Sequence, residues 1–213
     1  MEYTQALRNF WTVPTLEQAK HERVTVPPQP AAWTDEHQSR CVDRWLGDVP
    51  LRPGSVILDY GCGVGRMVRP VARRGCHVIA ADVSPQMLEF CRDYCAGMGE
   101  IEYVLSDGYG VPSLPTESVD GAFSFYVFQH MPCRSMAETV LADLWRVLKR
   151  GGWCKIQTVD TRANIPVERV GFHGERQTGA FLFETSRRIG FRSITLHSEA
   201  EDEDDVIVLT TRR

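Results

Sequence analysis

The stretch Val56-Ile-Leu-Asp-Tyr-Gly-Cys-Gly-Val-Gly65 decides the fold of this chain of 213 residues. Its first three residues are apolar, which is typical of a strand buried on both faces of a parallel sheet. Gly61, Gly63 and Gly65 follow at alternate positions, where they permit torsions and close approaches that a β-carbon would prevent. A helical pattern begins directly after them. A strand, a glycine-rich loop and a helix start together form a cradle for a nucleotide-like ligand.

The spacing of the glycines indicates which ligand the cradle takes. The dinucleotide fingerprint G-x-G-x-x-G is not matched, because the third glycine comes one residue early and Arg66 stands where that pattern has glycine. No Lys-Ser or Lys-Thr follows the loop, so the phosphate-binding P-loop pattern is absent as well. Asp59 directly precedes the loop, and its carboxylate would repel a polyphosphate. The same carboxylate would attract a ligand that carries an amino group.

Two further acids follow predicted strands. Asp82 ends the apolar run 78–82, at a distance from the glycine loop where an acid meets the two hydroxyls of a ribose. Asp107 follows a third predicted strand, 101–105, although an Asp-Gly pair of this kind also forms ordinary turns. Ser84 favours an N-cap for the helix that begins after Asp82.

The pattern D-x-G-x-G-x-G from Asp59 to Gly65, with the two later acids in order, resembles the motifs of class I S-adenosylmethionine-dependent methyltransferases. The resemblance spans about residues 34–160 and implies S-adenosylmethionine as the cofactor. In it, Asp82 holds the ribose, Val83 and Met87 line the adenine, and Asp107 accepts from the adenine amino group. The cofactor-binding residues that it implies are Asp59, Gly61, Cys62, Gly63, Gly65, Asp82, Val83, Met87, Asp107, Gly108 and Phe125.

The fourth predicted strand, 119–127, ends beneath the methyl donor in this resemblance. Phe125 falls where many relatives have Asn or Ser, so only backbone contact is expected there. His130 lies just beyond the strand and is the first candidate for a general base, because imidazole can titrate near neutral pH. Tyr126 is the second candidate. Both side chains alternatively serve only packing or hydrogen bonding at the end of the strand.

The whole pattern predicts an α/β fold, a Rossmann-like doubly wound sheet of seven strands with an antiparallel last strand. Residues 191–197 and 206–211 are its predicted antiparallel pair, with the acidic run 199–205 as the hairpin tip. Residues 1–33 form a predicted N-terminal helical lid and linker, and 34–213 the S-adenosylmethionine-binding methyltransferase domain. The lid either covers the acceptor or simply docks on the core.

Composition narrows the classes of function. The formal net charge is −4 and no strongly basic face is evident, so a nucleic-acid partner is not expected. No apolar stretch approaches the roughly 18 residues of a membrane span, and the N-terminus lacks a signal pattern. The seven cysteines have no zinc-ligand spacing, so we expect no metal and reduced thiols in a cytoplasmic protein.

These observations predict a methyltransferase that acts on an oxygen or nitrogen of a small-molecule acceptor. The strand-four motif of amino-group methyltransferases and the paired-glutamate loop of protein arginine methyltransferases are both missing. Two alternatives stay open, a catalytically silent methyltransferase-fold binding module and a methyltransferase for a protein or nucleic-acid acceptor. The sequence leaves the acceptor and the oligomeric state undetermined.

Overall fold

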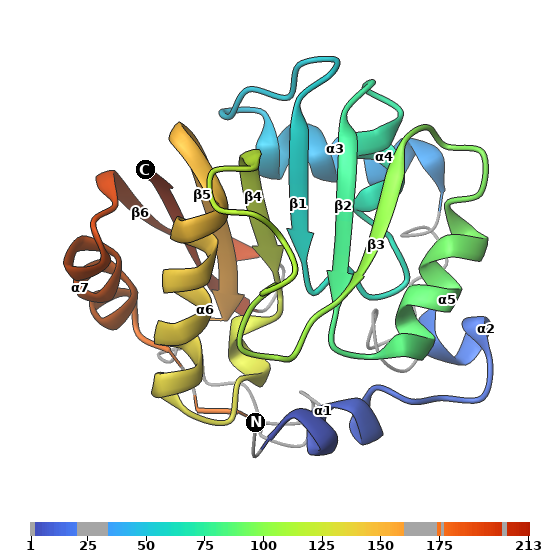
Figure 1. The fold of residues 1–213 in the computed structure, drawn as a ribbon, viewed down its shortest axis with the longest axis horizontal. Helices are drawn as coiled ribbons and strands as arrows, with labels where there is room; N and C mark the ends of the chain where they lie inside the picture. Colours follow the sequence, from blue (N-terminus) through green and yellow to red (C-terminus); the bar gives the residue numbers. More distant parts are fainter. Residues whose placement is uncertain (1–2, 21–33, 160–173, 176, 202–203) are drawn as a thin grey trace. The chain divides into compact units, whose positions relative to one another are not determined.

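The computed structural model describes residues 3–20, 34–159, 174–175, 177–201 and 204–213. The chain divides into two compact units, residues 1–106 and 107–213, and each is described by itself. Hydrogen bonds order the strands of the sheet as β3-β2-β1-β4-β5-β7-β6, which confirms the seven predicted strands (Figure 1).

The first unit contains three parallel strands and the helices that follow them. Register pairs Leu58 with Ile79 and Ala80 with Tyr103, so β1, β2 and β3 run side by side. The residues of β1 and β2 are almost all buried, as their apolar runs predict, whereas β3 buries only Val104. Elements of this unit are α1 (Thr4–Phe10), α2 (Leu16–Gln18), α3 (Asp35–Leu46), β1 (Val56–Tyr60), α4 (Val68–Ala72), β2 (His77–Asp82), α5 (Pro85–Tyr94) and β3 (Ile101–Leu105).

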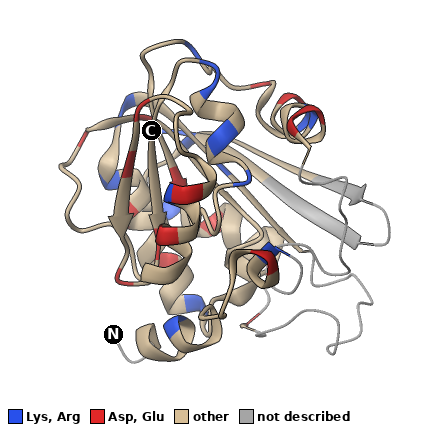
Figure 2. Ribbon diagram, turned by 90° about the vertical axis from the view of Figure 1, so that its right-hand side faces the viewer, with Lys and Arg blue, Asp and Glu red and all other residues tan. Residues whose placement is uncertain are grey.

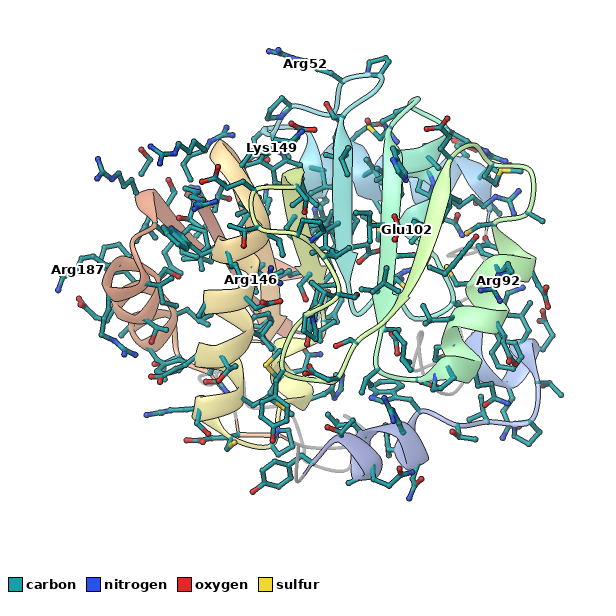
Figure 3. All side chains as sticks on the ribbon, viewed as in Figure 1. Arg52, Arg92, Glu102, Arg146, Lys149 and Arg187 are labelled. Carbon is teal, nitrogen blue, oxygen red and sulfur yellow. The ribbon has the colours of Figure 1, made fainter. Side chains whose placement is uncertain are left out.

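Helix α5 begins as its sequence predicts. The Ser84 hydroxyl accepts a hydrogen bond from the Met87 nitrogen over 3.3 Å, and proline occupies the first turn. The Arg92 guanidinium, labelled in Figure 3, lies 4.8 Å from the ring centroid of Tyr103 on β3. The helix is therefore anchored both at its start and on the strand beside it.

The second unit is a mixed sheet with two flanking helices. Strands β4 and β5 pair in parallel, and β7 runs antiparallel to β5 and to β6, which confirms the predicted antiparallel end of the sheet. A Cβ on Gly121 would overlap the Trp153 ring, so β4 carries glycine where β5 presents its indole. The elements are β4 (Val119–Phe125), η3 (Phe128–His130), α6 (Arg134–Val147), β5 (Leu148–Val159), α7 (Gly179–Ile189), β6 (Arg192–Glu201) and β7 (Asp204–Arg212).

Two boundaries in this unit differ from simple expectation. The Gly151-Gly152 pair predicts a helix end there and a fifth strand from Trp153. Instead, α6 ends at Val147 and β5 begins at Leu148, because Leu148 already pairs with Val119 of β4. The strands β6 and β7 extend into the acidic run, and Glu199 pairs with Val206. Residues 202 and 203 at the tip lie outside the described residues, as does most of the predicted N-terminal linker.

Charge is distributed over the surface of the described elements. Figure 2 shows basic and acidic residues interspersed along the helices and strands that it colours. Such a mixture does not favour binding to a polyanion. Within the described residues, no helix is long and apolar enough to cross a membrane.

Candidate cofactor site and candidate catalytic residues

The glycine loop that follows β1 is held against the end of β2. The backbone nitrogens of Gly61 and Cys62 both donate to the Ala81 carbonyl oxygen, at 2.7 and 3.0 Å. The φ angles of Gly61, Gly63 and Gly65 are 81°, 52° and 89°, in the left-handed region that side chains with a β-carbon rarely adopt. The loop therefore depends on glycine at all three positions.

The Asp82 carboxylate fastens this loop to the turn after β2. Its Oδ2 accepts from the Gly63 nitrogen and its Oδ1 from the Ser84 nitrogen, both over 2.9 Å. Only 8% of the residue is exposed. Each carboxylate oxygen can accept a further hydrogen bond, so the hydroxyls of a ribose fit this group.

The Asp59 carboxylate is buried at the end of β1, with 3% of the residue exposed. Burial raises the pKa of Asp59 well above its ordinary value, the negative charge of Asp82 adds to the increase, and Arg66 partly offsets it. Burial also raises the pKa of Asp82, against the lowering effect of its backbone donors. Two buried acids of this kind are stabilised as carboxylates by a ligand with a cationic amino group and hydroxyl donors. The ammonium, sulfonium and ribose of S-adenosylmethionine fit both requirements.

Gly65 lies against the C-terminal end of α5. A Cβ at this position would lie 2.7 Å from the Sγ atoms of both Cys91 and Cys95. Burial raises the pKa of the Cys62 thiol to about 12, and the pKa values of the two helix thiols are raised as well. Buried thiols that stay protonated at neutral pH are poor nucleophiles, so these cysteines act as packing groups.

The predicted adenine-lining residues lie at the start of α5, where the N-terminal helices reach them. Met87 is 1% exposed and packs in a buried cluster with Val13, Ala19 and Val64. The Val83 carbonyl oxygen accepts a hydrogen bond from Nε of Arg8 over 2.9 Å. The N-terminal helices therefore dock on residues of the predicted cofactor site.

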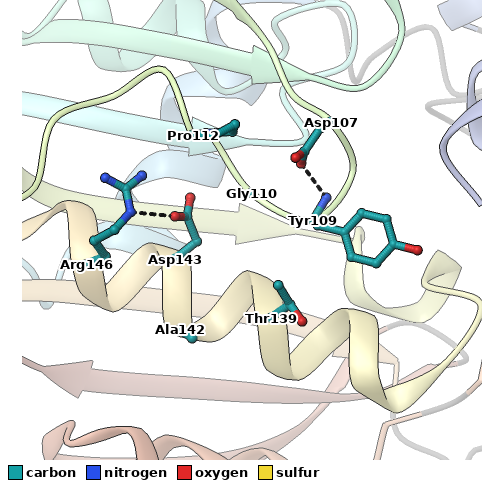
Figure 4. Close-up of a pocket in the computed structure, with 8 residues that line it drawn as sticks. All are labelled: Asp107, Tyr109, Gly110, Pro112, Thr139, Ala142, Asp143 and Arg146. Carbon is teal, nitrogen blue, oxygen red and sulfur yellow. Dashed lines mark hydrogen bonds and ion pairs between the residues drawn. The ribbon is translucent and has the colours of Figure 1, made fainter. Parts of the chain in front are cut away.

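In the second unit, Asp107 and Gly108 form the turn that opens the loop before β4. Asp107 Oδ1 accepts from the Tyr109 nitrogen over 2.8 Å, and Gly108 has a φ of 89°. Asp107 is also at one end of a pocket of about 330 Å³ between this loop and α6 (Figure 4). The pocket is lined by Asp107, Tyr109, Gly110, Pro112, Thr139, Ala142, Asp143 and Arg146.

Two charged groups of this pocket are bound to the protein itself. Asp143 accepts from the Val111 nitrogen over 2.7 Å and from Nε of Arg146 over 2.6 Å. The other two guanidinium nitrogens of Arg146 donate to the carbonyl oxygens of Leu114 and Val111. The ion pair therefore holds the loop on α6, and we do not assign a ligand to this pocket.

The two residues at the end of β4 have different environments. Phe125 pairs with Gln157 of β5, and its ring lies 5.3 Å from that of Phe123. Tyr126 has a φ of 57°, an outlier for a residue with a large side chain, and its nitrogen donates to the Gln157 carbonyl oxygen over 3.1 Å. The backbone is therefore strained at one of the two candidate catalytic residues.

The other candidate, His130, ends the short helix η3, and the chain near α7 holds this helix in place. The Gly174 nitrogen donates to the Gln129 carbonyl oxygen over 3.2 Å, and the Glu175 nitrogen donates to that of Met131 over 2.8 Å. A Cβ on Gly174 would overlap the Met131 carbonyl group. The backbone on both sides of His130 is thus fixed by a segment more than forty residues away in the sequence.

Glu175 also corrects one expectation about α6. The pattern Ser135…Glu138 predicts a capping box, but the helix begins at Arg134 and its N-cap Cys133 makes no side-chain capping bond. Instead, Glu175 Oε2 accepts from the Arg134 nitrogen over 2.9 Å. A cap supplied from so far along the chain leaves no local signal in the sequence.

Comparisons with known proteins agree with this geometry. Residues 58–156 match the family model described as a methyltransferase domain. A demethylmenaquinone methyltransferase of Tropheryma whipplei is 34% identical over 118 residues, which are 55% of this chain and 46% of that protein. An S-adenosyl-L-methionine-dependent Diels-Alderase of Talaromyces variabilis is 30% identical over 148 residues, 66% of this chain and 50% of that protein. The chain thus spans about half the length of these curated relatives.

A solved structure extends the likeness of fold to the whole chain. Magnesium protoporphyrin IX methyltransferase from Synechocystis PCC 6803, with bound S-adenosylmethionine, superimposes with a TM-score of 0.72 at 17% identity. The alignment covers 100% of this chain and 98% of that one. At this identity the likeness establishes the fold alone. With the matched family model and the motifs within it, residues 58–156 form a methyltransferase domain of the class I S-adenosylmethionine-dependent type.

Proposed function

We propose that this chain transfers a methyl group from S-adenosylmethionine to an oxygen or nitrogen of a small-molecule acceptor. The observation that carries the proposal is the pair of buried carboxylates, Asp59 and Asp82, on either side of the glycine loop. When bound, S-adenosylmethionine supplies a methyl group that its sulfonium already activates. The protein's own residues then have to bind the cofactor and align the acceptor with its methyl group. They also have to remove a proton from an acceptor that carries one.

Asp59 and Asp82 bind different parts of the cofactor. In this proposal Asp59 pairs with the ammonium group, because its carboxylate is buried and Arg66 offsets only part of the increase in its pKa. Asp82 accepts from the ribose hydroxyls with the lone pairs that Gly63 and Ser84 leave open. The roles of Asp107, Gly108 and Phe125 stay predictions from the resemblance.

We assign removal of the acceptor's proton to His130, with Tyr126 as the second candidate. The backbone bonds on both sides of His130 keep its position fixed, as a general base requires. The backbone strain at Tyr126 also favours a functional role for this region. A left-handed torsion costs roughly 1–2 kcal/mol, and such strain is common at functional sites. An acceptor that loses its proton spontaneously needs only alignment.

A labelling experiment tests the class of acceptor. The protein is incubated with methyl-labelled S-adenosylmethionine and a cell extract that is separated into small-molecule, protein and nucleic-acid fractions. Label in the small-molecule fraction, formed far more slowly by the His130→Ala variant, is the expected result. Label that enters protein or nucleic acid instead would contradict the proposed acceptor class.

A second candidate function is a cofactor-dependent reaction without methyl transfer. It is favoured by the relative that is named as a Diels-Alderase and by Phe125, which offers no polar side chain at the end of β4. The two candidates differ in stoichiometry. A methyltransferase consumes one S-adenosylmethionine for each product, whereas the second candidate forms product with the cofactor unchanged.

A further inference from the structure

The two N-terminal helices are built into the first unit through a buried apolar cluster. We call residues 3–20, which contain α1 and α2, the N-terminal segment. Val13 and Ala19 of this segment are at most 2% exposed and pack with Val64 and Met87. Val64 belongs to the glycine loop and Met87 to the predicted adenine wall. Figure 1 shows α1 beyond the carboxyl ends of β1 and β2, which is the edge where these residues lie.

Two hydrogen bonds join the same segment to the turn after Asp82. Nε of Arg8 donates to the Val83 carbonyl oxygen over 2.9 Å, across 75 positions of the sequence. The backbone nitrogen of Val13 donates to Oε1 of Gln86 over 2.7 Å, across 73 positions. Both acceptors belong to the stretch 83–87, so two hydrogen bonds attach the N-terminal segment to this turn.

The inner side of this turn is fixed by the predicted ribose carboxylate. The Ser84 nitrogen donates to Asp82 Oδ1 over 2.9 Å, and the carbonyl oxygen of the same peptide group, that of Val83, accepts from Arg8. A single peptide group therefore connects Arg8 with Asp82. The side chain of Gln86 is committed to Val13 in the same way, so neither Arg8 nor Gln86 needs to touch the cofactor to affect it.

We propose that Arg8 and Gln86 are positioning residues of the cofactor site, which couple docking of the N-terminal segment to cofactor binding. The inference rests on the proposed placement of the cofactor at the glycine loop and Asp82. Coupling between two binding events is reciprocal. The cofactor binds more tightly when the segment is docked, and the segment docks more tightly when the cofactor is bound.

Affinity for S-adenosylhomocysteine, a product that cannot react further, tests the first half of this statement by calorimetry. The Arg8→Ala and Gln86→Ala variants each lose one hydrogen bond, and we expect affinity to fall about tenfold for Arg8→Ala and less for Gln86→Ala. Arg8→Lys keeps a donor and should recover part of the loss. Gln5→Ala is the matched control, because Gln5 lies on the same helix and bonds only its exposed neighbour Asn9 among the contacts described.

Hydrogen exchange at the Val13 amide tests the second half. Exchange should slow when S-adenosylhomocysteine binds the wild-type protein, by about the factor that Arg8→Ala loses in affinity. A merely structural contact would leave exchange at this amide the same with and without the ligand. Such a result, or unchanged affinity in both folded variants, would overturn the inference.

The Asp82→Ala variant separates the failure of this inference from that of the proposed function. If Asp82→Ala weakens binding while Arg8→Ala and Gln86→Ala do not, the coupling is wrong and the cofactor site stands. If Asp82→Ala binds as tightly as the wild type, the placement of the cofactor fails and the coupling fails with it.

Discussion

The backbone nitrogen of Gly63 donates a hydrogen bond to Oδ2 of Asp82 over 2.9 Å, so that the glycine loop and the end of β2 share one carboxylate. The loop is therefore shaped by the same group that is expected to bind the ribose. Changes at this carboxylate should affect both the shape of the loop and the affinity for the cofactor.

Asp82→Ala is expected to lower affinity for S-adenosylhomocysteine by about 10- to 100-fold. The reason is the loss of charged hydrogen bonds, which contribute roughly 1.5–3 kcal/mol each. Calorimetry gives the measurement, and Asp93→Ala is the control, because Asp93 is an exposed acid on α5. Equal affinities for Asp82→Ala and Asp93→Ala would contradict the assigned role.

Asp59→Asn is expected to stabilise the ligand-free protein at neutral pH. Because the pKa of Asp59 is raised in the folded state, mainly by burial, the folded protein binds more protons than the unfolded chain between about pH 4 and the raised value. Stability due to this group is present at low pH and is lost as the pH rises through that window. Asn cannot ionise, so thermal unfolding of the variant should depend less on pH.

Asp35→Asn should change the stability of the protein at neutral pH in the opposite direction in the same experiment. The pKa of Asp35 is lowered, chiefly by its hydrogen bond with Arg73, so its contribution is present above the ordinary range and is lost as the pH falls. The variant should therefore be less stable at neutral pH. S-adenosylhomocysteine should raise the melting temperature of Asp35→Asn as much as that of the wild type, and that of Asp59→Asn less. Identical ligand effects in the two variants would refute the pairing of Asp59 with the ammonium group.

Glu175→Ala should destabilise the second unit by roughly 0.5–2 kcal/mol, the scale for loss of a helix cap. Its carboxylate caps α6 at the Arg134 nitrogen and forms a half-exposed ion pair with the Arg134 guanidinium over 3.1 Å. Urea unfolding measures the effect. Glu184→Ala serves as the control, since Glu184 forms an exposed pair within α7. A shift no larger than that of the control would show that the cap has no net effect.

His130→Ala is expected to lower turnover by about 10²–10⁴-fold, with affinity for S-adenosylhomocysteine nearly unchanged. The dependence of the rate on pH in the range where imidazoles titrate should disappear. Turnover against pH for both proteins provides the measurement once the acceptor is identified. If the variant keeps the wild-type rate and profile, His130 is structural and positioning alone carries the reaction.

The positions of the strands could be predicted because their signals are local, whereas the doubly wound sheet followed from the family resemblance. Apolar runs that end in Asp59 and Asp82, and the N-cap Ser84, depend on neighbours in the sequence, and the structure places all three as expected. The start of α6 could not be predicted, since its cap comes from Glu175. The hydrogen bond from Arg8 to the Val83 carbonyl oxygen could not be predicted either, because a single arginine on a short helix does not indicate a partner 75 positions away.

The contact of Gly65 with two thiols has a consequence for how this family can vary. A β-carbon at position 65 has no room while Cys91 and Cys95 keep their sulfur atoms, and its φ of 89° adds a torsional cost. Larger residues at 91 and 95 would press on the loop from the other side. Substitutions at these three positions are thus constrained by one another, and in an alignment of related sequences their side-chain volumes should vary together.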